Sequence, residues 1–362
     1  MMLGKLKPVA AFFVALGVGL TPLSAVYAAA KSDAGSSSVS RAKQPSATKK
    51  KQVAPSAVRR PAVKSTAAGK VNKVPAVKKA PVVKAVPLSD ARLHEERLLD
   101  VRSGAALVVE LTGGGALFQK NADAIVPIAS ITKLMTAMVV LDGSPDLQAS
   151  VSVSEEDVDY LRGSRSRLHV GATMTRETAL LLALMSSENR AAHALARHYP
   201  GGMPAFLVAM NDKAHSLGMR DTRFEDPTGL TSNNVSTAHD LAKMVSAAYR
   251  YPLIREFSTT PGASVEVAGR QLEFHNTNPL VKNTAWDVGL SKTGYINEAG
   301  KCLVMQARVA DRPVVIVLLD SVGKLTRVGD ANRIKRWMEN THASRNVRAQ
   351  QASFKPSGAS PG

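Results

Sequence analysis

Two kinds of hydrophobic pattern occupy the chain between about residues 105 and 340. Short apolar runs lie near the two ends of this region and predict strands at residues 105–111, 116–120, 289–296, 302–310 and 313–319. Leu- and Ala-rich stretches between them predict helices at residues 134–141, 175–186, 189–198 and 204–217, with two more starting at residue 236 and covering residues 330–339. We therefore expect one sheet assembled from both ends of this region, with the middle helices forming a second lobe.

The first 30 residues have the pattern of a secretory signal peptide. Lys5 and Lys7 precede an apolar run over residues 9–20, and small residues follow up to residue 30. The run is shorter than the roughly 20 residues that span a bilayer. It predicts export through a cleavable signal and a location in the periplasm. An uncleaved anchor is the alternative.

The net charge of +18 is concentrated in one segment. Residues 31–88 carry 14 Lys and Arg against one acid, whereas residues 89–362 together carry about +3. The segment contains six prolines and no aromatic residue, so we expect it to be disordered. In an exported protein its partner would be an anionic envelope polymer and not nucleic acid; the alternative is a spacer without a partner.

The rest of the composition narrows the chemistry. A single cysteine excludes an internal disulfide framework and a cysteine-based zinc site. The eight histidines form no H-E-x-x-H pattern, so we expect neither a metal nor a cofactor. The predicted catalytic domain covers residues 89–340, and the polar residues 341–362 are expected to form a disordered tail.

A candidate nucleophile lies at the start of the helix predicted over residues 134–141. Ser130 and Lys133 are three residues apart, which puts both side chains on one helical face. The helix N-terminus favours a developing anion, and a lysine made neutral by burial can take the serine proton. The same S-x-x-K pattern also occurs at Ser40, Ser46 and Ser321, so taken alone it favours an ordinary helix cap over a nucleophile.

Two further motifs follow in a fixed order. Ser187-Glu188-Asn189 lies at the break between two predicted helices, and Lys292-Thr293-Gly294 lies within a predicted strand. Taken alone, the first is consistent with helix capping and the second with a charged edge strand. All three motifs together, in this order and in fitting structural contexts, are the signature of active-site serine enzymes that act on penicillin or D-Ala-D-Ala peptides.

Over residues 95–340 the sequence resembles the low-molecular-mass penicillin-binding proteins, which are D-alanyl-D-alanine carboxypeptidases or endopeptidases. The resemblance extends beyond the motifs to residues 127–142, 181–202, 226–230, 234–240 and 292–300. The resemblance implies an α+β fold of the serine β-lactamase and DD-peptidase type. This fold has a five-stranded antiparallel sheet flanked by helices, an all-helical lobe and a cleft between them.

The resemblance also implies a role for each motif residue. Ser130 would attack the D-Ala carbonyl and form an acyl-enzyme, with Lys133 as general base. Ser187 would relay a proton to the leaving amine, and Asn189 would hold Lys133 and the substrate amide.

The substrate-binding residues implied in the same way belong to one strand. Lys292 and Thr293 would offer a positive charge and a hydroxyl to the substrate or to the penicillin carboxylate. Gly294 lets another group approach the backbone closely. The backbone N–H groups of Ser130 and Tyr295 would form the oxyanion hole.

Within this family the sequence favours an endopeptidase that cleaves cross-links between D-Ala and a diamino acid in peptidoglycan and that penicillin inhibits. Only about 20 polar residues follow Glu339, where carboxypeptidases usually carry a further β-domain. A D-alanyl-D-alanine carboxypeptidase stays the alternative. A β-lactamase fits less well, because no Glu-x-x-Leu-Asn pattern lies between Asn189 and Lys292. A non-catalytic wall-binding module that acts through the basic segment is the non-enzyme alternative.

Overall fold

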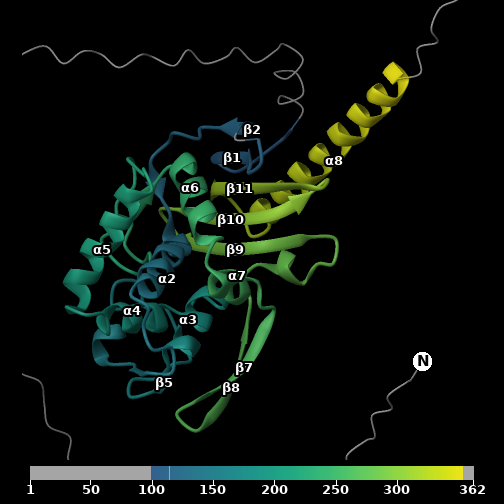
Figure 1. Cartoon of the computed structure of the whole chain (residues 1–362). Coiled ribbons are helices and arrows are strands. Elements are labelled where there is room, and N and C mark those ends of the chain that lie inside the picture. Colours follow the sequence, from purple (N-terminus) through teal and green to yellow (C-terminus); the bar gives the residue numbers. More distant parts are fainter. Residues whose placement is uncertain (1–98, 114, 354–362) are drawn as a thin grey trace, which may run out of the picture. The chain divides into compact units, whose positions relative to one another are not determined.

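The computed structural model describes residues 99–113 and 115–353, the last nine of them by backbone only (Figure 1). The predicted signal peptide, the basic segment 31–88 and the domain start at residue 89 lie outside the described residues. Within the described residues, no helix has the length and apolar character needed to cross a membrane.

The sheet is five-stranded and antiparallel, and it joins the two ends of the described chain. Its order is β2 (Ala116–Lys120), β1 (Ala105–Glu110), β11 (Arg312–Ser321), β10 (Gly300–Val309) and β9 (Asp287–Ile296). Strand β1 pairs with β11 from Ala105 opposite Leu319 to Glu110 opposite Val314. The predicted single sheet built from both termini is therefore confirmed.

Both faces of the sheet are covered, which explains why the central strands β1 and β11 are apolar over most of their length. On one face Leu107 and Val317 belong to the large core shared with α6 (Ala238–Ala248) and α7 (Pro252–Thr259). On the other face Val108 and Ile316 belong to a smaller core under α8 (Thr326–Ser353). Alternating side chains along each strand thus supply two separate cores.

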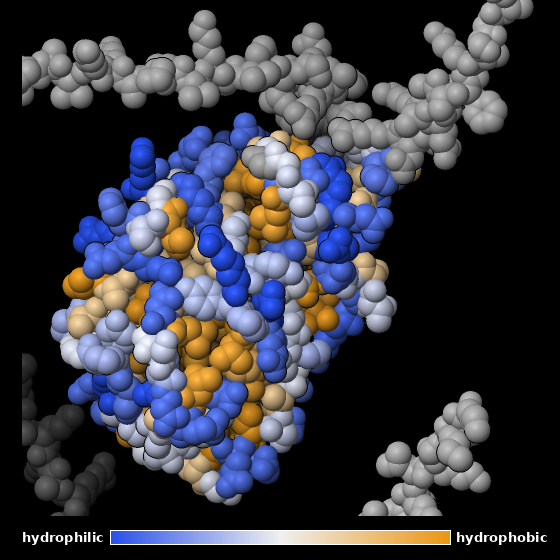
Figure 2. Space-filling view, in the orientation of Figure 1, coloured by the Kyte–Doolittle hydropathy of each residue, from blue (hydrophilic) through white to orange (hydrophobic). Residues whose placement is uncertain are grey.

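The middle of the chain forms the predicted helical lobe from α2 (Lys133–Asp142), α3 (Arg176–Met185), α4 (Asn189–Arg197) and α5 (Gly202–Ser216). Helix α3 begins where the Thr175 side chain accepts a hydrogen bond from the Thr178 amide, as its sequence indicates. Helix α5 ends just before Gly218, which has φ +69°. Apolar residues show between polar ones over α3 and α4 in Figure 2.

Three parts of the structure differ from the prediction. The helix expected to end at Glu339 continues through Ser353, so the first part of the tail predicted to be disordered from residue 341 is helical. Helix α7 and the hairpin of β7 (Gly262–Val267) and β8 (Arg270–His275) were not predicted. Short pieces complete the described elements: the pairs β3 (Val126–Pro127) with β6 (Val235–Ser236) and β4 (Ser150–Ser152) with β5 (Thr173–Thr175), and the 3-10 turns η1 (Ala129–Thr132), η2 (Glu155–Asp157) and η3 (Pro279–Lys282).

Candidate active site

Ser130 lies in the 3-10 turn η1 that leads directly into α2, so the turn is tighter than the helix start expected from the sequence. Two glycines let the neighbouring backbone close around this turn. A Cβ on Gly229, which has φ +82°, would lie 1.9 Å from the Ala129 carbonyl oxygen. A Cβ on Gly294 in β9 would lie 3.1 Å from the Ser130 amide nitrogen. Ala129 itself has φ +49°, a conformation that non-glycine residues rarely adopt. The nucleophile candidate is thus fixed by its surroundings at a strained turn.

Lys133 is fully buried behind this turn. Its Nζ lies 2.9 Å from Ser130 Oγ, 2.7 Å from Asn189 Oδ1 and 2.8 Å from the Thr228 carbonyl oxygen. Burial lowers its pKa from 10.5 to about 7, although Asp226, Glu188 and Asp159 act in the opposite direction. Near neutral pH a large fraction of Lys133 is therefore the free amine, the form that can accept a proton.

The loop that carries Thr228 is organised by one carboxylate. Asp226 Oδ1 accepts hydrogen bonds from the Thr228 amide at 2.5 Å and the Gly229 amide at 2.6 Å, and Oδ2 accepts from the Thr231 amide at 2.9 Å. These bonds fold residues 226–231 into a turn whose carbonyl at Thr228 meets Lys133. The family resemblance found in the sequence includes residues 226–230 but implies no role for them.

Ser187 and Asn189 come from the connection between α3 and α4. Ser187 has φ +62°, and its Oγ accepts a hydrogen bond of 2.8 Å from Lys292 Nζ. Asn189 opens α4, and its amide faces two ways: Oδ1 toward Lys133, and Nδ2 toward Ser164 Oγ at 2.9 Å. This connection therefore joins the Ser130–Lys133 pair to β9.

Strand β9 supplies the other predicted residues. Lys292 and Thr293 are both buried, and burial lowers the pKa of Lys292 well below 10.5, with the charges of Lys133 and Arg327 adding to the effect. Thr293 Oγ1 donates to Thr277 Oγ1 at 2.6 Å. Tyr295 is exposed; its hydroxyl donates to Asn297 Oδ1 at 2.9 Å, and Lys301 Nζ lies 3.8 Å from the centre of its ring.

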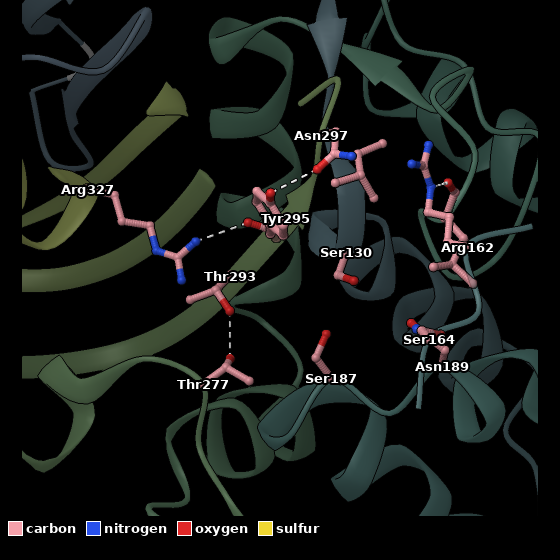
Figure 3. Close-up of a pocket in the computed structure, with 13 residues that line it drawn as sticks. Ser130, Arg162, Ser164, Ser187, Asn189, Thr277, Thr293, Tyr295, Asn297 and Arg327 are labelled. Carbon is pink, nitrogen blue, oxygen red and sulfur yellow. Dashed lines mark hydrogen bonds between the residues drawn. The ribbon is translucent and has the colours of Figure 1, made fainter. Parts of the chain in front are cut away.

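These residues share one open cavity of about 490 Å³ (Figure 3). Six of the eight predicted residues line it: Ser130, Ser187, Asn189, Thr293, Gly294 and Tyr295. The two lysines contact lining residues from behind. The structure thus brings all eight predicted residues together.

Other lining residues were missed by the sequence analysis: Arg162, Ser164, Thr277 and Arg327. Arg327 donates from Nη1 to the Gly294 carbonyl at 3.0 Å. It lies at the start of α8, 33 residues after Gly294 in the sequence. No local motif marks any of the four. The lining contains two arginines and no carboxylate, so the cavity favours an anionic ligand.

In the part of the chain that the structure describes, no three His, Cys, Asp or Glu side chains come close enough to hold a metal ion. The chemistry that the cavity offers is a serine hydroxyl beside a buried amine, with donors and positive charge around them. These are the groups that nucleophilic acyl transfer requires.

Comparison with known proteins gives a consistent result. The family model described as D-alanyl-D-alanine carboxypeptidase matches residues 91–323. A D-alanyl-D-alanine endopeptidase of Pseudomonas aeruginosa is 50% identical over 242 residues, which cover 66% of this chain and 78% of that protein. The D-alanyl-D-alanine endopeptidase of Escherichia coli K12 is 47% identical over the same shares.

Solved structures give the same fold. The Streptomyces K15 DD-transpeptidase superposes with a TM-score of 0.61 at 29% identity, over 66% of this chain and 97% of that one. The ampicillin-bound penicillin-binding protein D2 of Listeria monocytogenes gives 0.57 at 27% identity, over 66% and 98%. The predicted fold class is confirmed by these neighbours and by the five-stranded sheet.

Proposed function

The chain belongs to the D-alanyl-D-alanine carboxypeptidase family of serine peptidases, which act on peptidoglycan, and on this basis we propose that it is an endopeptidase that hydrolyses cross-links between D-Ala and a diamino acid. The observation that carries the proposal is the hydrogen-bonded group of Ser130, Lys133 and Asn189, which meets Lys292 and Ser187 at one cavity. Three endopeptidases among the relatives are 36–50% identical, whereas a carboxypeptidase of Bacillus subtilis is 31% identical.

In the proposed mechanism Lys133 is the general base. A neutral amine has two N–H donors and one lone pair. Because Asn189 Oδ1 and the Thr228 carbonyl can only accept, they take the two N–H groups, and the lone pair faces the Ser130 hydroxyl. Ser130 Oγ then loses its proton to Lys133 and forms a bond to the D-Ala carbonyl carbon.

The oxyanion is stabilised by the backbone N–H groups of Ser130 and Tyr295. Support for this role comes from the close approach of Gly294 in β9 to the Ser130 amide. A substituent on the glycine would separate the two donors.

The leaving amine receives its proton through Ser187. As the bond from the carbonyl carbon to nitrogen breaks, the Ser187 hydroxyl gives its proton to the amine and regains one from Lys133. Lys292, hydrogen-bonded to Ser187 Oγ, orients that hydroxyl. Water then hydrolyses the acyl ester and restores Ser130. Asn189 also holds the substrate amide in this scheme.

Substrate binding uses the positive end of the cavity. Thr293 and Arg327 line the cavity and face the carboxylate of the residue on the leaving side, or the carboxylate of a β-lactam. Lys292, buried behind Ser187, would gain its charge when this carboxylate binds, because an opposite charge nearby favours the protonated amine. A β-lactam would therefore acylate Ser130 and act as a covalent inhibitor.

Two experiments test this function. Fluorescent penicillin should label the wild-type protein and not Ser130→Ala. Purified cross-linked muropeptides should be converted to monomers whose stem length is unchanged. Loss of only a terminal D-Ala would instead assign the carboxypeptidase activity, and labelling that survives Ser130→Ala would exclude Ser130 as the nucleophile.

For the chain outside the described residues, we propose export to the periplasm by cleavage of residues 1–30. The charged start, the short apolar run and the small residues before residue 31 support it. N-terminal sequencing of protein recovered from a periplasmic extract tests the cleavage. A mature protein that still begins at Met1 would contradict it.

We further propose that residues 31–88 bind an anionic polymer of the cell envelope. The support is their charge of about +13 on a proline-containing segment without aromatic residues. Deleting them should weaken binding to isolated sacculi, and binding by the full chain should fall as salt rises, with penicillin acylation intact. Unchanged sacculus binding after the deletion would reduce the segment to a spacer.

A further inference from the structure

The proposed base depends on the direction in which one amide points. Asn189 presents its oxygen to Lys133, which leaves the lysine lone pair for Ser130. If the amide rotated by half a turn, its N–H groups would face Lys133 Nζ instead. The lone pair would then accept from the amide and would no longer face the nucleophile. Something in the structure has to distinguish these two orientations.

The distinction comes from the segment that precedes α3, on the side of the amide away from Lys133. Asn189 Nδ2 donates to Ser164 Oγ at 2.9 Å. A serine hydroxyl could in principle donate to the amide as well as accept from it. Here the Asp159 carboxylate accepts from the Ser164 amide at 2.9 Å, and a hydrogen bond from the Ser164 side chain contributes to its lowered pKa, so the hydroxyl proton is directed to Asp159 and not to the Asn189 amide. Figure 3 shows Ser164 beside Asn189 at the cavity wall.

Asp159 is a fixed acceptor at the start of this chain of bonds. Its carboxylate also accepts from the amides of Leu161 at 3.0 Å, Arg162 at 2.9 Å and Ser164 at 2.9 Å. Burial alone would raise its pKa, but the hydrogen bonds from Ser164, Arg162 and Leu161 outweigh burial and lower the pKa. Asp159 therefore stays ionised, and an ionised carboxylate can only accept.

The donors and acceptors consequently run in one direction through four groups. Asp159 accepts a hydrogen bond from the Ser164 hydroxyl, Ser164 Oγ accepts one from the Asn189 N–H, and Asn189 Oδ1 accepts one from Lys133. Resting on the proposed function, we propose that Ser164, oriented by Asp159, is a positioning residue that fixes the Asn189 amide and so aims the Lys133 lone pair at Ser130.

The test is the second-order rate of acylation by penicillin, measured on the full chain at a series of pH values spanning the Lys133 pKa. Ser164→Ala removes the acceptor, and its rate should fall by roughly 10- to 100-fold, as when an orienting partner of a reacting group is lost. Ser164→Thr keeps the hydroxyl and should restore the rate. Ser154→Ala is the matched control. It removes another serine hydroxyl that bonds an aspartate of this segment, Asp157, without touching the amide.

The pH profile separates positioning from mere loosening of the loop. A reversed amide places N–H donors against Lys133, which disfavours its protonated form, so the acid limb of the Ser164→Ala profile should move to lower pH. A loop that simply loosens would admit water and move the limb to higher pH. Lys133 is surrounded by the charges of Asp226, Glu188, Asp159 and Lys292, and Ser164→Ala changes none of them.

A double-mutant cycle completes the test. A carboxylate has no direction to lose, so in an Asn189→Asp background the Ser164→Ala change should cost little further rate. Wild-type rate and pH profile in Ser164→Ala, or a full additive loss in the double variant, would overturn the inference. If the wild-type chain itself resists acylation, the proposed function fails instead, so the two failures are distinguishable.

Discussion

Replacing Lys133 by methionine should abolish acylation and at the same time change the pH dependence of stability. The lysine is fully buried, and its pKa falls from 10.5 to about 7 on folding. Each pKa unit corresponds to about 1.4 kcal/mol, so holding this lysine in the folded protein costs about 5 kcal/mol below pH 7. Between about pH 7 and 10.5 the unfolded chain keeps a proton that the folded chain has released, and wild-type stability therefore rises with pH.

Methionine removes this titration but leaves two acceptors without a donor, Asn189 Oδ1 and the Thr228 carbonyl. If each unpaired acceptor costs about 1.5 kcal/mol, the variant should be about 2 kcal/mol more stable than wild type near pH 6. Near pH 9 the remaining lysine cost is about 2 kcal/mol, and the variant should be about 1 kcal/mol less stable.

The assay is urea unfolding followed by circular dichroism at both pH values, with penicillin acylation measured in parallel. Acylation should fall by at least about 100-fold, the typical contribution of a general base. The decisive quantity is the change of about 3 kcal/mol in the stability difference between the two pH values, which does not depend on the cost assigned to the lost hydrogen bonds. A difference that stays constant with pH would refute the buried neutral lysine.

Three further outcomes follow from the same structure. The acylation rate of the wild-type protein should rise with pH and reach half its plateau near the Lys133 pKa of about 7, measured with penicillin in stopped flow; a rate that does not vary with pH would contradict Lys133 as the base. Gly229→Ala should lower both stability and acylation, because its Cβ would lie 1.9 Å from the Ala129 carbonyl oxygen at φ +82°; thermal melting and labelling check this, and a wild-type melting temperature would refute the contact. Asp330→Ala should destabilise the folded protein by roughly 3–5 kcal/mol, because its buried carboxylate accepts hydrogen bonds from the Ser103 amide at 2.8 Å and from the Ser103 hydroxyl at 2.6 Å. Urea unfolding measures this loss, and penicillin labelling of the folded fraction should stay unchanged.

The sequence identified the elements whose pattern is local. Apolar runs marked β10 and β11, because both faces of these strands are buried and most of their residues are apolar. Two misses also had local signals. The hairpin of β7 and β8 has alternating residues on either side of Ala268-Gly269, and Pro252 stands at the first position of α7.

The end of α8 had no comparable signal. Beyond Glu339 the residues are polar and give no hydrophobic period, so the pattern that predicts a helix stops there although the backbone continues to Ser353. Hydrophobic periodicity reports only which residues are expected to be buried, so a polar stretch of helix gives it no signal.

The sequence alone identified the candidate reacting groups, because each motif sets a geometry within a few residues. Ser130 and Lys133 meet across one turn, and the order of the three motifs along the chain indicates which other residues belong to the candidate site. The surroundings of these groups depend on how distant parts of the chain pack together. Ser164 and Arg327 reach the cavity through contacts with residues 25 and 33 positions away, and burial on all sides lowers the pKa of Lys133. Desolvation and hydrogen-bond direction depend on how distant segments pack, and no local spacing encodes them.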